Sequence, residues 1–261
     1  MFPCLNLSVL KSSKFWSFFF WTVLGTLIFL FLYTAYALFG GPDVCELQKA
    51  NPETTAFMDL RKEAWEDGGR KRKIDRRWVS LSAISRHLKN AVVVTEDPNF
   101  YSHKGIDFYA IRLALEEDIR QRRIAYGAST ITQQLMKNLY LSPSLNPLRK
   151  WREAILALRV ERCVKKNRIL EVYLNVIEWG ESIYGIEAAS RRYFGKSAAT
   201  LNVAESALLT AMIPNPILYN PYRRNPQLIK NKNLTLRLML RARKVSRSEY
   251  YAAVNQRVIL R

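Results

Sequence analysis

Two adjacent acids head the first group of residues whose types could do chemistry. Glu96 and Asp97 follow the apolar run Ala91–Thr95, and His103 and Gly105 come shortly after them. A carboxylate at the edge of an apolar element loses hydration, which raises its pKa toward a value useful for proton transfer. The group therefore predicts a general acid or base. The alternative is a helix-to-loop junction whose acids only cap an element.

The second group spans residues 127–138 and combines small polar residues with a helical pattern. Glycine, serine and threonine open a predicted helix, whose first turn offers unbonded backbone N–H groups to an anion. Gln133 and Lys137 lie four residues apart and share one helix face, with Ser129 and Gln134 close by. This composition suits a phosphate or sugar site, and an ordinary N-cap followed by a surface helix is the alternative.

Two further groups lie on predicted helices. Arg149 and Lys150 precede Glu153 at a helix start, where the basic side chains suggest a pyrophosphate site. A carboxylate in a first turn could instead simply complement the helix dipole. Glu171 and Asn175 are four residues apart on a helix that is otherwise apolar. Such a polar pair usually forms a structural hydrogen-bond network, which is the interpretation we favour for it.

The elements that must position these groups are predicted to be helices. From residue 81 onward, apolar residues recur at three- and four-residue spacings, most clearly in Ile131–Leu141, Arg149–Val164, Arg168–Val176 and Leu201–Ile213. Ala91–Thr95 is the exception, because its β-branched residues favour a strand. No alternating βαβ pattern and no internal repeat occur. The sequence therefore predicts an all-α or mainly α domain.

An uncharged segment precedes this domain. The chain of 261 residues is 49% hydrophobic and 24% charged, which excludes wholesale disorder. No residue between Lys14 and Asp43 is charged, and Phe15–Phe39 exceeds the roughly 20 residues that cross a hydrocarbon core. We expect an uncleaved membrane anchor. A cleaved signal peptide is the alternative, since Ala35–Ala37 resembles a cleavage site, although its apolar core is typically only about 7–15 residues.

The charges around the anchor predict its orientation. Lysines precede the span and acids follow it, so the positive-inside rule places residues 1–14 in the cytoplasm and the bulk of the chain outside. The formal net charge of +19 predicts an anionic partner. Outside the cytoplasm we expect lipid headgroups or a lipid-linked phosphate rather than nucleic acid. The basic cluster Arg70–Arg77 is either a solvated linker or a contact with such headgroups.

Taken together, the four groups resemble the motifs of the peptidoglycan glycosyltransferases of family 51, lysozyme-like enzymes that polymerise lipid II. The matching motifs are E-D-x-x-F-x-x-H-x-G at 96–105, G-x-S-T-I-T-Q-Q at 127–134, R-K-x-x-E at 149–153 and I-L-E-x-Y-L-N at 169–175. A fifth stretch, between Gly185 and Pro216, also fits. The resemblance covers about residues 85–221 and implies a mainly α, lysozyme-like glycosyltransferase domain behind one N-terminal transmembrane helix. It also implies a helix at Ala91–Thr95, and we follow it there over the local strand preference. Because the chain ends soon after this region, we expect a monofunctional enzyme without a transpeptidase domain.

The resemblance also implies a reaction and residue roles. Such enzymes join the glycan of a lipid-pyrophosphate donor to the 4-hydroxyl of another lipid II, with inversion to a β-1,4 linkage and release of polyprenyl pyrophosphate. Glu96 is then the base that deprotonates the acceptor hydroxyl, and Glu153 is the second essential carboxylate. The residues expected to hold pyrophosphate oxygens, shape the sugar sites or brace the helices are Asp97, Ser129, Gln133, Gln134, Lys137, Arg149, Lys150, Glu171 and Asn175.

Three features leave questions open at this level. Leu145 stands where many relatives carry an arginine, so pyrophosphate binding is expected to depend more on Lys137 and Arg149. Enzymes of this type often use Mg²⁺ or Mn²⁺, but no cluster of metal-ligating residues in the sequence indicates one. Cys45 and Cys163 are taken as free thiols by default, because no spacing rule brings their Cα atoms within bonding range.

The predicted organisation is a cytoplasmic N-terminus (1–14), an anchor (15–39), a basic juxtamembrane segment (40–80), the glycosyltransferase domain (81–225) and its helical extension (226–261). The expected location is the bacterial inner membrane with the domain on the periplasmic side. Expected partners are lipid II, the growing strand, the bilayer and other cell-wall synthesis or division proteins. Two alternatives stay open: a lysozyme-like glycan hydrolase, which shares the fold and two acids, and a non-enzymatic membrane-tethered interaction protein.

Overall fold

The computed structural model describes residues 13–121, 127–144, 146–223 and 225–261, and the chain divides into two compact units between Asp43 and Val44. The first unit contains α1 (Ser13–Phe39), which is long and apolar enough to cross a membrane. The hydroxyls of its threonines at 22, 26 and 34 donate to backbone carbonyls four residues earlier. These polar side chains are therefore satisfied within the helix, as a hydrocarbon surrounding requires.

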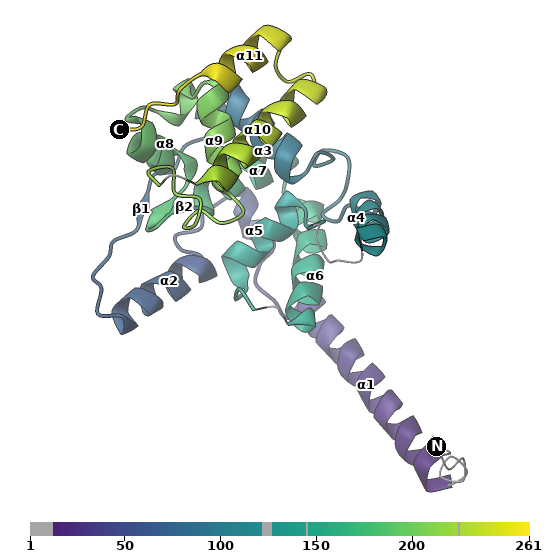
Figure 1. The fold of residues 1–261 in the computed structure, drawn as a ribbon. Coiled ribbons are helices and arrows are strands. Elements are labelled where there is room, and N and C mark those ends of the chain that lie inside the picture. Colours follow the sequence, from purple (N-terminus) through teal and green to yellow (C-terminus); the bar gives the residue numbers. More distant parts are fainter. Residues whose placement is uncertain (1–12, 122–126, 145, 224) are drawn as a thin grey trace, which may run out of the picture. The chain divides into compact units, whose positions relative to one another are not determined.

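The second unit is mainly helical, as the sequence predicts (Figure 1). Its α-helices are α2 (Ala56–Asp67), α3 (Arg86–Glu96), α4 (Phe108–Gln121), α5 (Ile131–Tyr140), α6 (Pro147–Cys163), α7 (Lys166–Val176), α8 (Ile186–Phe194), α9 (Val203–Met212), α10 (Pro226–Arg241) and α11 (Arg247–Asn255). Short 3-10 helices lie at Val44–Gln48, Leu81–Ala83 and Ala198–Thr200. The four segments whose apolar periodicity is clearest form α5, α6, α7 and α9.

A small sheet of three short strands completes the unit. The central strand β3 (Ile183–Tyr184) pairs in parallel with β1 (Asp75–Arg76) and antiparallel with β2 (Glu178–Gly180). The strand that β-propensity favours at Ala91–Thr95 is absent, because these residues lie in α3. Helical spacing places Leu88, Ala91 and Val92 on one buried face of α3, and this packing overrides the local preference.

The core lies around α7 and has two parts. Helix α7 buries seven of its residues and packs against α5 and α8, while α5 also packs against α6. A second cluster forms where α3, α9 and α10 lie side by side (Figure 1). Of the two motifs that carry Glu96 and Glu153, the first lies at the end of α3 and contacts α5 through Gln134, and the second lies on α6, which packs against α5.

Residues 44–80 belong to the folded unit instead of forming a separate linker. Part of the basic cluster is neutralised within the protein, since Arg70 and Arg72 pair with Glu181. The Arg76 guanidinium donates to two backbone carbonyls, those of Pro52 and Glu53. These contacts fix the cluster to the sheet and to the loop before α2.

The free-thiol expectation for Cys45 and Cys163 is wrong. The two residues form a disulfide with Cα atoms 5.5 Å apart, across a sequence separation of 118. The bond joins the Val44–Gln48 helix to the last residue of α6, and these two elements pack together. Only the tertiary arrangement brings the two thiols together.

Candidate active site

Glu96 is the last residue of α3. The helix ends there because Asp97 precedes Pro98, and a residue before proline is driven out of the α region. The side chain is partly buried, and burial raises its pKa above the ordinary carboxyl value, with the nearby Asp97 adding to the effect. A raised pKa makes the ionised Glu96 a stronger base than an ordinary carboxylate, which suits it to proton transfer.

Gln134 of α5 is the direct partner of Glu96. Its Nε2 donates to Glu96 Oε2 at 2.9 Å, and its Oε1 accepts from the Tyr173 hydroxyl of α7 at 2.8 Å. The amide donor favours the ionised carboxylate and so opposes the effect of burial on the Glu96 pKa. Glu96 of α3, Gln134 of α5 and Tyr173 of α7 thus form one hydrogen-bonded group.

Asp97 faces the protein interior. Its Oδ2 accepts from the Ile131 backbone N–H at 3.0 Å, at the start of α5, and both oxygens lie 3.0 Å from His103 Nε2. The Gly105 N–H donates to His103 Nδ1, so Nε2 carries the ring proton and donates to Asp97. Asp97 therefore anchors the loop after α3 to the N-terminus of α5.

The start of α5 is fixed by a capping box and by a close backbone approach. Thr130 and Gln133 cap the helix reciprocally, and Thr130 Oγ1 donates to the Gly105 carbonyl at 2.6 Å. Gly105 has φ +93, and a Cβ there would lie 2.7 Å from the Ala157 carbonyl oxygen. The position therefore requires glycine. Gln133 contributes by capping the helix.

Glu153 lies on α6, where it is 2% exposed. Arg149 Nη1 donates to its Oε2 at 2.5 Å, and Lys150 Nζ donates to its Oε1. Lys150 also donates to Ser129 Oγ at 2.7 Å. The helix begins with Pro147 at its first turn after the Asn146 cap, which places these side chains on one face. The carboxylate thus orders two cations, a role beyond complementing the helix dipole.

Lys137 of α5 connects the two carboxylates. Burial lowers its pKa, while Glu153 and Glu96 each act to raise it, and Arg149 and Lys150 act in the opposite direction. The ammonium therefore lies in the electrostatic field of both acids at once. It also stands 5.6 Å from the centre of the Phe57 ring of α2. The three motifs that carry Glu96, Lys137 and Glu153 converge at this amine.

Glu171 and Asn175 form a structural hydrogen-bond network, as their spacing in the sequence favours. Glu171 Oε2 accepts from the Leu81 N–H at 2.7 Å, and the Asn175 side chain exchanges hydrogen bonds with the Val79 backbone in both directions, each 2.9 Å long. Arg168 donates to Glu171 from the same helix at 2.5 Å. The pair holds the segment before α3 against α7.

The predicted site residues thus separate into two sets. One set surrounds Lys137 or contacts its neighbours and comprises Glu96, Glu153, Ser129, Gln134, Arg149 and Lys150. The other braces the fold and comprises Asp97, Gln133, Glu171 and Asn175. Tyr173 was absent from the predicted set, although it occupies the fifth position of the I-L-E-x-Y-L-N motif. Leu145 lies outside the described residues.

The described ranges give no support for a resident metal centre. Among them, no three His, Cys, Asp or Glu side chains gather where they could hold a metal ion. One Glu96 oxygen accepts from Gln134, and both Glu153 oxygens accept from Arg149 and Lys150. These residues do not fit a bound Mg²⁺ or Mn²⁺, and we derive no step through one.

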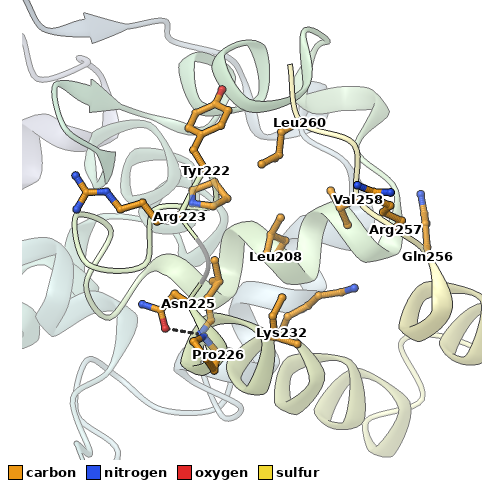
Figure 2. Close-up of a pocket in the computed structure, with 13 residues that line it drawn as sticks. Leu208, Tyr222, Arg223, Asn225, Pro226, Lys232, Gln256, Arg257, Val258 and Leu260 are labelled. Atoms are coloured by element: carbon orange, nitrogen blue, oxygen red, sulfur yellow. Dashed lines mark hydrogen bonds between the residues drawn. The ribbon is translucent and has the colours of Figure 1, made fainter.

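A mostly apolar cavity of about 530 Å³ lies elsewhere in the second unit. Figure 2 shows it between α9, α10 and the C-terminal segment, lined by Leu208, Tyr222, Val258 and Leu260, with Lys232 at its side. None of the predicted site residues lines it. The catalytic assignment therefore depends on the convergence at Lys137 and not on this cavity.

Comparisons with known proteins follow the same motifs. A family model described as Transglycosylase matches residues 64–240. A biosynthetic peptidoglycan transglycosylase of Nitrosomonas eutropha is 46% identical over 186 residues, which cover 71% of this chain and 76% of that protein. Its counterpart from Laribacter hongkongensis is 38% identical over 219 residues, or 84% and 96% of the two chains.

The structure of penicillin-binding protein 1A from Haemophilus influenzae aligns with 72% of this chain at 22% identity and a TM-score of 0.43, and the match spans 18% of that protein. The family assignment rests on the family model and on the curated relatives. The family model and these relatives confirm that the sequence motifs are those of a peptidoglycan glycosyltransferase and that the chain is an enzyme. The chain belongs to the transglycosylase family and is a peptidoglycan glycosyltransferase.

Proposed function

We propose that this enzyme polymerises lipid II into linear glycan strands by inverting glycosyl transfer, with Glu96 as the base. The observation that supports this mechanism is the electrostatic interaction of Lys137 with both Glu96 and Glu153. Inverting displacement needs a base at the acceptor hydroxyl and positive charge at the leaving group. Glu96 supplies the base, and Lys137 with Arg149 and Lys150 supplies the positive charge.

Glu96 acts on the acceptor. In its ionised form it takes the proton of the sugar 4-hydroxyl while the oxygen attacks the anomeric carbon of the donor. The Gln134 amide donates to one oxygen of the carboxylate and holds it in place, which leaves the other oxygen available to the sugar hydroxyl. A positioned base of this kind contributes a factor of about 10²–10⁴ to the rate.

Lys137, Arg149 and Lys150 act on the leaving group. As the glycosidic bond breaks, negative charge grows on the pyrophosphate, and cations already in place stabilise it without reorganisation. Glu153 accepts hydrogen bonds from both Arg149 and Lys150, so the carboxylate preorganises the pair. A divalent cation brought in with the pyrophosphate stays a separate proposal, which titration with a chelator tests.

The catalytic unit lies outside the cytoplasm in this proposal. Apolar α1 serves as the anchor, and the basic excess before it favours a cytoplasmic N-terminus. The disulfide between Cys45 and Cys163 supports an oxidising compartment, where such bonds persist. A reporter enzyme that works only in the cytoplasm can be fused after Arg261. Activity of this fusion would contradict the proposed orientation.

The test is lipid II turnover by the purified full chain and by Glu96→Gln. We expect the wild type to produce long glycan strands and the variant to retain about 1% of the rate or less. Glu63→Gln, at an exposed position on α2, is the matched control and should keep full activity. Shortening of existing strands without synthesis would favour the hydrolase, and equal activity of Glu96→Gln would exclude Glu96 as the base.

A further inference from the structure

Tyr173 has no part in the mechanism described so far, yet a single side chain, that of Gln134, links its hydroxyl to the base. The side chain is completely buried in α7. Its hydroxyl donates to Gln134 Oε1 at 2.8 Å, and Gln134 Nε2 donates to Glu96 Oε2 at 2.9 Å. The three groups form a continuous chain of hydrogen bonds that ends on the carboxylate.

In this chain the Tyr173 hydroxyl is the donor and the Gln134 amide oxygen is its acceptor. A glutamine amide presents a donor at one end and an acceptor at the other, and rotation by 180° exchanges them. Burial, together with the charges of Glu96 and Asp97, raises the Tyr173 pKa well above its usual value, so the hydroxyl keeps its proton. A donating hydroxyl holds the amide oxygen toward Tyr173, which leaves the amide N–H groups for Glu96.

The rotated amide would have the opposite effect on the base. Its oxygen would face Glu96 Oε2, and two acceptors at hydrogen-bond distance repel unless the carboxylate is protonated. A protonated Glu96 cannot accept the proton of the sugar hydroxyl. The orientation of Gln134 is therefore coupled to the protonation state that the reaction needs.

We propose that Tyr173 is a positioning residue for Glu96, which fixes the orientation of the Gln134 amide and thereby keeps the carboxylate ionised and held in place. The inference rests on the proposed function, in which Glu96 is the base. Tyr173 touches neither substrate nor reacting atoms in this role, and it acts only through Gln134.

The other charged groups around Glu96 are unchanged when the hydroxyl is removed. Asp97 follows it in the chain and raises its pKa, and Lys137 from α5 lowers it. Lys137 in turn interacts electrostatically with Glu153, which pairs with Arg149 and Lys150 on α6. An effect of Tyr173→Phe on the titration of Glu96 would therefore report on the hydrogen-bond chain.

The experiment is the pH profile of kcat/KM for lipid II polymerisation by the full chain and by Tyr173→Phe. Loss of the hydroxyl lets the amide rotate, and the acid limb should move to higher pH by about one unit. Below that limb, kcat/KM should fall about tenfold, since one pKa unit is a factor of ten. On the plateau, kcat and KM should both stay within about twofold of the wild type.

Tyr193→Phe is the matched control. Tyr193 is another buried tyrosine, 2% exposed, whose hydroxyl donates to the Trp179 carbonyl at 2.9 Å, away from Glu96. It should lose a comparable hydrogen bond and leave the acid limb in place. A shift of the same size in Tyr193→Phe would show a general effect of loosened packing and would overturn the inference.

Gln134→Met tests the route. It should shift the acid limb upward by itself, and adding Tyr173→Phe should shift it no further. A further shift in the double variant, or an unshifted limb in Tyr173→Phe, overturns the inference. If Tyr173→Phe does not fold, an unshifted limb in Gln134→Met does the same. The proposed function is tested separately, by the loss of polymerisation in Glu96→Gln. If that loss is observed while the predictions for Tyr173 fail, only the role of Tyr173 is overturned.

Discussion

Replacing Cys45 and Cys163 together by serine removes a covalent link between the beginning of the folded unit and the end of α6. The two residues are separated by 118 positions in the sequence, while their Cα atoms lie 5.5 Å apart. In the unfolded chain, a link over such a distance excludes most conformations. The chain-entropy treatment gives about 5 kcal/mol of stability at 25 °C for a loop of this length.

This free energy corresponds to a large change in melting temperature. For a unit of 150–250 residues, 1 kcal/mol moves Tm by roughly 2–4 °C, so the double variant should melt about 10–20 °C below the wild type. Activity below the transition should stay within about twofold. The contacts of Glu153 with Arg149 and Lys150 lie within α6 and do not need the link.

Thermal unfolding of the full chain in detergent, followed by circular dichroism under non-reducing conditions, measures the effect. Intact mass with and without reductant shows whether the bond is present. Cys4→Ser is the control, because it removes the third cysteine and leaves the link. A fall in Tm of less than about 2 °C for the double variant, in protein whose bond is verified by mass, would refute the entropic reasoning.

Two other predictions follow from the site. Because burial raises the pKa of Glu96, and the base must be ionised, kcat/KM should fall as pH drops through a value above the ordinary carboxyl pKa of about 4.3; an acid limb at or below that value contradicts this. Gly105→Ala should destabilise the protein by about 1–3 kcal/mol in denaturant unfolding, because φ is +93 and the new Cβ would meet the Ala157 carbonyl at 2.7 Å. Gly127→Ala meets no atom within 4 Å and should change stability by less than about 0.5 kcal/mol, so equal losses in the two variants would disprove the steric argument.

Local pattern was sufficient for most of the secondary structure. Apolar periodicity places α5, α6, α7 and α9 within a few residues of their observed bounds, because the apolar residues of each helix pack into the core. It failed at Ala91–Thr95, where β-branched side chains favour a strand locally. Packing against α9 and α10 decides for the helix there, and that contact is not visible in the segment itself.

Residue types and spacings within a few turns were enough to predict the apolar N-terminal helix, the helical class, the order of the motifs and the two candidate acids. Which of these side chains meet depends on how the helices pack. The tertiary structure brings Lys137 into the electrostatic field of both Glu96 and Glu153, places Asp97 against His103 and the α5 terminus, and pairs Cys45 with Cys163. Such contacts join residues that are tens of positions apart, and their geometry follows from how whole helices pack, which no local spacing encodes.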